Sequence, residues 1–133
     1  MNLLLIGDFF PTPDRNSADF RLMRLIGMLQ AGHQVFYCAP GEQRQAIKFG
    51  AEVTARYRAE LAASGVQVVD GGVLAALRAR RYDAVVFEWH FPAVAFIDAV
   101  RQLQPAARVL VDSVDVVFHR LQAGKCHSKT TAS

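Results

Sequence analysis

Short apolar runs separated by longer helical segments constrain the fold of this chain more than any other feature of its sequence. Each run is nearly continuous in apolar side chains, which is typical of strands buried on both faces of a parallel sheet. The runs lie at residues 2–8, 34–38, 66–69, 82–88 and 108–112. A hydrophobic fraction of 52% supplies enough apolar surface for such a sheet and argues against a disordered chain.

The segments between these runs have helical composition and helical end signals. Asn16 or Ser17 is a good N-cap for the first helix, which we expect to end at Gly32. The apolar side of this helix is predicted to consist of Phe20, Leu22, Met23, Leu25, Ile26 and Leu29. Further helices are expected at residues 42–64, with a division at Gly50, at 73–81 and at 92–104.

Strands that alternate with helices along a chain predict an α/β fold. We expect a Rossmann-like, doubly wound parallel sheet of about five strands, with right-handed crossovers and a three-layer α/β/α arrangement. Such sheets bind ligands at the carboxyl ends of their strands. The residues expected at those ends are Asp8, Cys38, Asp70, Glu88 and Asp112.

A length of 133 residues fits a single domain with one core. We assign residues 1–124 to this domain, including the start of a further helix at 116–122. Residues 125–133 lose all periodicity and become small and polar, so we expect a disordered tail or the end of a truncated chain.

Charge and cysteine content exclude several classes of protein. The net charge is only +3, and the basic residues are scattered among acidic ones, which argues against a nucleic-acid-binding surface. Cys38 and Cys126 lack metal-ligand spacing, so we expect neither a disulfide framework nor a bound metal. The apolar run at residues 3–6 is too short for a signal peptide or a membrane span. These features predict a cytoplasmic protein, and the slight positive charge leaves peripheral contact with an anionic inner-membrane surface open.

The usual cofactor motifs are missing from the sequence. The turn Gly7-Asp8-Phe9-Phe10-Pro11 replaces the glycine fingerprint that lets a backbone approach a dinucleotide pyrophosphate. The sequence also has no GxxxxGK[ST] phosphate loop, no GxSxG nucleophile elbow and no HExxH pair. We therefore predict no NAD, FAD or other cofactor.

Several short motifs occur in a characteristic order. They are LLIGD, PTPDRNS, GHQV, YDAVV and VDSVD, which begin at residues 4, 11, 32, 82 and 111. In combination they resemble the N-terminal, acceptor-side domain of bacterial GT-B glycosyltransferases (glycosyl transferase group 1, family 4-like) from residue 1 to about residue 120. The glycine pair that often follows the first strand in that family is replaced here by Arg15-Asn16.

The resemblance implies a function shared between two domains. In that family the N-terminal domain binds the acceptor, a C-terminal Rossmann domain binds the sugar nucleotide, and transfer occurs in the cleft between them. The implied partners are thus a nucleotide-sugar donor and a hydroxyl acceptor. The 133 residues hold no second domain, so we expect this chain to be an incomplete enzyme that is inactive alone. A cleft face without its second domain also leaves homodimerisation open.

Catalytic roles are predicted for three residues at and beyond the end of the fifth strand. They are Asp112, Asp115 and His119, where a carboxylate or an imidazole can accept the proton of an acceptor hydroxyl. For the two aspartates, turn formation or helix capping is an equally weighted alternative. For His119 the alternative is a place on a helix surface.

Substrate binding is predicted for two further places. At the first, free N–H groups and the positive end of a helix dipole can face a donor phosphate, with ordinary capping as the alternative. Its residues are Asp14, Arg15, Asn16 and Ser17. At the second, Glu88 and His90 flank Trp89 in a cluster suited to sugar hydroxyls, with a structural role as the alternative.

Two other functions stay open. A receiver-like signalling module is suggested by Asp8 and Asp70 at predicted strand ends. However, the chain lacks a lysine after the fifth strand, where residues 113–115 stand, and an acidic pair after the first. A non-catalytic interaction fragment is the remaining alternative.

Overall fold

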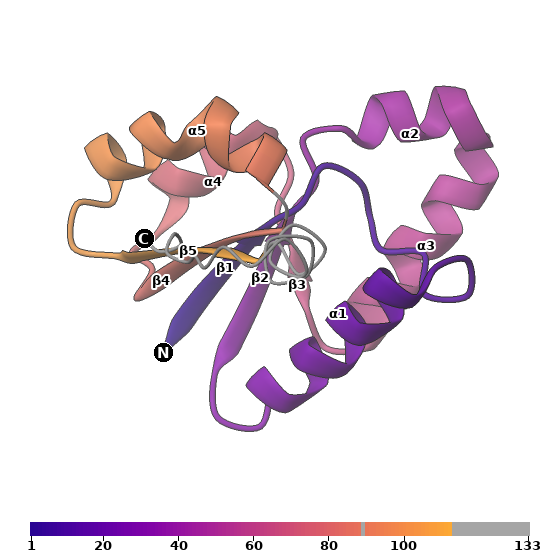
Figure 1. The fold of residues 1–133 in the computed structure, drawn as a ribbon, viewed down its shortest axis with the longest axis horizontal. Coiled ribbons are helices and arrows are strands. Elements are labelled where there is room, and N and C mark those ends of the chain that lie inside the picture. Colours follow the sequence, from indigo (N-terminus) through magenta and orange to yellow (C-terminus); the bar gives the residue numbers. More distant parts are fainter. Residues whose placement is uncertain (89, 113–133) are drawn as a thin grey trace, which may run out of the picture.

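The computed structural model describes residues 1–88 and 90–112, which form a parallel five-stranded sheet with helices on both faces (Figure 1). Each strand is apolar and each helix carries one apolar side, so both kinds of element bury their apolar surface against the other. In chain order the elements are β1 (Asn2–Ile6), α1 (Ser17–Leu29), β2 (Gln34–Cys38), α2 (Glu42–Phe49), α3 (Ala51–Ala63), β3 (Gln67–Val68), α4 (Gly72–Ala79), β4 (Ala84–Glu88), α5 (His90–Leu103) and β5 (Arg108–Asp112).

The sheet is the middle of three layers, with a core on each face. Because successive side chains of a strand point to opposite faces, Leu3 and Leu5 of β1 pack beneath α1 and α3. Leu4 and Ile6 pack against α4 and α5 on the other face. Figure 1 shows α4 and α5 together on one side of the sheet and α1 and α3 on the other. The predicted Rossmann-like α/β/α fold is confirmed.

The strand order indicates where on the carboxyl edge of the sheet a ligand is expected. The order is β3-β2-β1-β4-β5, which matches the first five strands of a Rossmann sheet. Ligands of such sheets bind where the strand order reverses, here at the carboxyl ends of β1 and β4. Receiver domains have the order 2-1-3-4-5, in which β1 pairs with β3. The receiver-like alternative therefore does not fit this topology.

Most predicted element boundaries agree with the structure. The fifth strand has the predicted bounds, and the long helical segment is divided at Gly50, whose φ of 103° is accessible mainly to glycine. The third strand is shorter than predicted, with only Gln67–Val68 paired to β2. The last helix begins at His90, before the predicted start at Pro92, because a proline is tolerated throughout the first turn of a helix.

The apolar side of α1 is narrower than predicted. Leu22 and Ile26 are buried, whereas Phe20 is 54% exposed. Two residues along a helix correspond to a rotation of about 200°, so Phe20 and Leu22 point in nearly opposite directions. The prediction that Phe20 joins the inner side is wrong for this reason.

Gly7 lies where the chain leaves β1 and has no room for a side chain. A Cβ atom at this position would overlap the hydroxyl of Tyr37, which donates a hydrogen bond to the Phe9 carbonyl. We expect Gly7→Ala to lower the free energy of unfolding by about 2–3 kcal/mol, because the ring must move and its hydrogen bond is lost. Gly27 on α1 has open space around its Cβ position, so Gly27→Ala should raise stability by up to about 1 kcal/mol. Urea unfolding of both variants tests this, and equal effects would contradict it.

Candidate functional site

Two carboxyl groups lie side by side at the carboxyl edge of the sheet. Glu88 ends β4 and pairs in register with Asp112, which ends β5. Paired residues of parallel strands share a face, and this pair lies on the face covered by α1. There α1 presents Arg21, whose Nη2 donates a hydrogen bond of 2.6 Å to Oδ2 of Asp112. The pairing of β4 with β5 thus brings Glu88 and Asp112 together, and α1 adds the Arg21 guanidinium beside Asp112.

Glu88 is the unusual member of this pair. Its side chain is only 8% exposed, and its Oε2 atom has no hydrogen-bond partner within the described part of the chain. Burial raises the pKa of Glu88 to about 9, and the negative charge of Asp112 adds to the increase. Glu88 is therefore protonated at neutral pH. A neutral carboxyl group with a free oxygen can donate or accept a hydrogen bond from a bound ligand.

The loop between β1 and α1 frames the same edge of the sheet and is fixed by a buried glutamine. The Phe10 N–H donates to Oε1 of Gln45 on α2 at 2.8 Å, and Nε2 of Gln45 donates to the Phe10 carbonyl at 3.1 Å. The Phe10 ring is buried against Tyr37. Sequence reasoning missed Gln45, because a glutamine in an amphipathic helix normally indicates a solvent-facing position.

The predicted substrate residues Asp14 and Arg15 both contact Tyr57 of α3. The Tyr57 hydroxyl donates to Oδ1 of Asp14 at 2.6 Å and accepts from Nε of Arg15 at 3.2 Å. The hydrogen bond from Tyr57 lowers the pKa of Asp14. The Arg15 guanidinium also lies over the rings of Phe49 and Tyr57, 5.2 and 5.9 Å from their centroids. These contacts hold the loop against the α2–α3 pair.

Asn16 and Ser17 are placed at the start of α1, as the sequence predicted. Oδ1 of Asn16 accepts a hydrogen bond of 2.7 Å from the Asp19 N–H, which makes Asn16 the N-cap. Oδ2 of Asp19 in turn accepts from the Thr12 N–H at 2.7 Å. Among the described residues no hydrogen bond joins this capping network to the Glu88–Asp112 pair. The predicted contact with a donor phosphate remains a prediction.

Three predicted site residues lie outside the described residues or are described only in part. Asp115 and His119 lie outside the described residues, and His90 is described only as the first residue of α5. The described residues contain no group of three or more side chains able to hold a metal ion. Within residues 1–88 and 90–112, no helix has the length and apolar character needed to cross a membrane.

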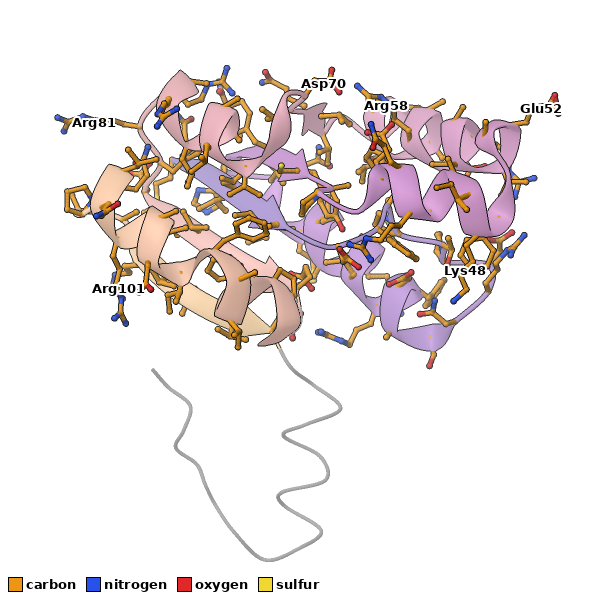
Figure 2. The ribbon with its side chains drawn as sticks, turned by 90° about the horizontal axis from the view of Figure 1, so that it is seen from above. Lys48, Glu52, Arg58, Asp70, Arg81 and Arg101 are labelled. Carbon is orange, nitrogen blue, oxygen red and sulfur yellow. The ribbon has the colours of Figure 1, made fainter. Side chains whose placement is uncertain are left out.

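The remaining strand-end acids are each held by an arginine. Asp8 forms an ion pair with Arg44 of α2. Asp70 forms one of 2.7 Å with Arg58 of α3, and the two side chains lie together at one edge of the molecule (Figure 2). Of the acids at strand ends, Glu88 alone combines burial with an unpartnered oxygen within the described residues.

Arg21 is the part of the site that sequence reasoning did not assign. It lies 91 residues before Asp112 in the chain, so no local pattern connects them.

Scans against protein-family models and against curated proteins find no match for the chain. The fold and the site define a Rossmann-like domain with an acid pair at the carboxyl edge of its sheet.

Proposed function

We propose that this domain is the acceptor-side half of a GT-B glycosyltransferase that transfers a sugar from a nucleotide donor to a hydroxyl. The observation that supports the proposal most is the buried Glu88 carboxyl beside the Arg21-bound Asp112 at the switch point of the sheet. The sequence motifs at the end of β1, at the start of β4 and at the end of β5 are consistent with the same function.

In the proposed reaction the acceptor hydroxyl attacks the anomeric carbon of the donor sugar. The new bond joins the acceptor oxygen to that carbon, while the bond between the carbon and the diphosphate oxygen breaks. The acceptor proton passes to the Asp112 carboxylate, which Arg21 orients by its 2.6 Å hydrogen bond. The neutral Glu88 carboxyl donates a hydrogen bond to a sugar oxygen and so fixes the acceptor beside Asp112.

The loop before α1 has a second role in this proposal. Asp14, Arg15, Asn16 and Ser17 stand at the positive end of the α1 dipole, which favours a bound phosphate. The donor diphosphate would therefore approach this loop, with Arg15 released from Tyr57 or bridging to the phosphate from its present position. The negative charge on the departing diphosphate is stabilised at this loop.

Asp112→Asn tests the catalytic part of the proposal. We expect transfer to fall by about 10²- to 10⁴-fold, because the amide cannot accept the proton. The assay follows sugar transfer from a panel of nucleotide sugars to hydroxyl acceptors by the full-length product of the gene. Asp98→Asn, an exposed substitution on α5, is the matched control and should leave transfer unchanged. Equal transfer by both variants, or no transfer with any donor, would contradict the proposal.

A further inference from the structure

β5 is an edge strand whose outer side has no neighbour within the described residues. It pairs with β4 alone, whereas the opposite edge of the sheet ends in the two-residue strand β3. Leu110 is 53% exposed and Val111 is 43% exposed, although adjacent residues of a strand point to opposite faces of the sheet. The outer side of β5 is therefore open on both faces. The strand contains neither proline nor lysine, the residues that protect many edge strands from pairing.

The backbone of β5 offers hydrogen-bonding groups on this open side. The Arg108 N–H donates to the Asp83 carbonyl at 3.0 Å, so it points towards β4. The backbone groups of successive strand residues point to opposite sides of the strand. Those of Val109 and Val111 therefore point away from β4. A row of such groups is a template on which a further strand can pair.

The side chains of β5 are complementary to those of a second β5 that runs antiparallel to it. With Leu110 opposite its own copy, Val109 lies opposite Val111, and the outward backbone groups of these two residues bond to one another. Arg108 then lies opposite Asp112, and two-fold symmetry repeats this charge pair at the other end. Residues directly opposite share a face, with Cβ atoms about 4.5–5.5 Å apart, which is within reach of an ion pair.

We propose that two copies of this chain dimerise by antiparallel pairing of their β5 strands, which joins two five-stranded sheets into one. Charge complementarity selects the register. The adjacent registers that also pair the outward backbone groups place Leu110 opposite Arg108 or Asp112, and so separate both charge pairs. A parallel, in-register pairing would set like charges side by side, which is unfavourable. A closed two-fold dimer is also the commonest form of a homo-oligomer.

The dimer adds a residue to the candidate site. Asp112 accepts a hydrogen bond from Arg21 at Oδ2, and a carboxylate can accept further bonds at its other oxygen. Arg108 of the partner subunit lies next to Asp112, on the face of the sheet that carries Glu88. Asp112 is thus flanked by two guanidinium groups, one from each subunit. Dimerisation does not depend on the proposed transferase activity, and its tests use no activity measurement.

Sedimentation velocity of the 133-residue chain over a range of concentrations tests the dimer. We expect a reversible equilibrium between monomer and dimer. Arg108→Asp sets like charges opposite each other at both ends of the paired strands, so it should raise the dissociation constant at least about tenfold. Arg81→Asp makes the same change of charge at a side chain that points into solvent beyond the end of α4 (Figure 2). At physiological ionic strength this control should alter the constant by less than about twofold, because salt screens distant surface charges.

Two outcomes of this experiment overturn the proposal. The first is a chain that stays monomeric up to about 1 mM, which is the result expected if another segment or another protein covers β5. The second is a dimer that Arg108→Asp leaves as stable as Arg81→Asp does, which would place the interface elsewhere.

Disulfide formation tests the register independently. Cys126→Ser removes the second cysteine of the chain, and the remaining Cys38 is buried. Leu110→Cys then places two thiols opposite each other on the two-fold axis, with Cα atoms about 4.5 Å apart, a distance that a disulfide spans. Val111→Cys is the matched control, because its copy lies diagonally across the pair at about 7–8 Å, beyond the reach of a disulfide.

Under mild oxidation, Leu110→Cys should form covalent dimers at least about tenfold faster than Val111→Cys. The two positions are similarly exposed, so reactivity alone does not separate them. Equal rates of dimer formation, or faster formation by Val111→Cys, would overturn the proposed pairing.

Discussion

The free energy of unfolding should fall as the pH rises from about 5 to about 9, and Glu88→Gln should abolish that fall. Glu88 has a pKa of about 9 in the folded chain, against an ordinary value of 4.5. The folded state therefore keeps a proton that the unfolded state releases above pH 4.5. A group with a raised folded pKa contributes stability that is complete below its unfolded pKa and is lost as the pH approaches its folded pKa.

The expected size of this effect is large for a small domain. Between the unfolded and the folded pKa, each pH unit lowers the free energy of unfolding by about 1.4 kcal/mol. Over the whole range the loss amounts to several kcal/mol. The charged groups around Glu88 act in opposite directions: Asp112 and Asp19 raise its pKa, and Arg21 lowers it. Glutamine has the shape of a protonated glutamate but does not ionise, so Glu88→Gln should keep its stability up to pH 9.

Urea unfolding at a series of pH values measures this profile. Glu52→Gln is the matched control, because Glu52 lies in the first turn of α3 and points into solvent (Figure 2). Other shifted groups act outside the window: the pKa of Asp14 is lowered, and that of Cys38 is raised to about 11. A parental profile that is flat between pH 5 and 9, or a Glu88→Gln profile that falls as steeply as the parent, would show that Glu88 is not held neutral.

Replacing Gln45 by alanine should lower the free energy of unfolding by about 3 kcal/mol. The substitution removes two buried hydrogen bonds and leaves the N–H and the carbonyl of Phe10 without partners. It also opens a cavity beneath the loop, because the Gln45 side chain is almost completely buried. The loop before α1 should then exchange its amide protons faster than the sheet does.

Gln43→Ala is the control for this experiment. Gln43 is exposed on the same helix, so the same change of residue type there should alter stability by less than about 0.5 kcal/mol. Hydrogen exchange followed by mass spectrometry separates a local effect on residues 9–16 from global destabilisation. Equal stability of the two variants would mean that Gln45 does not hold the loop.

Both predictions concern the carboxyl edge of the sheet. In the proposed function Glu88 holds the acceptor at this edge, and Gln45 fixes the loop that borders it. Neither residue contributes through ordinary apolar packing. A domain selected for stability alone gains nothing from a buried carboxyl without a partner, and this is why we place the function at Glu88.

The sequence by itself determined the alternation of strands and helices. Five apolar runs separated by capped helices leave few arrangements other than a doubly wound parallel sheet, because each run must be covered on both faces. Local signals such as Asn16 at the start of α1 and Gly50 between α2 and α3 were also readable, since capping and positive φ depend on a few neighbouring residues. The carboxyl-end positions of Glu88 and Asp112 followed from the same pattern.

Only the tertiary structure decided which of these residues act together. The ion pair of Arg21 with Asp112 joins residues far apart in the chain, and the burial of Glu88 depends on the register of β4 with β5 and on the position of α1. The inward direction of Gln45 was equally unreadable from helical periodicity. Burial and non-local contact are properties of packed elements, and the pKa of a carboxyl group depends on both.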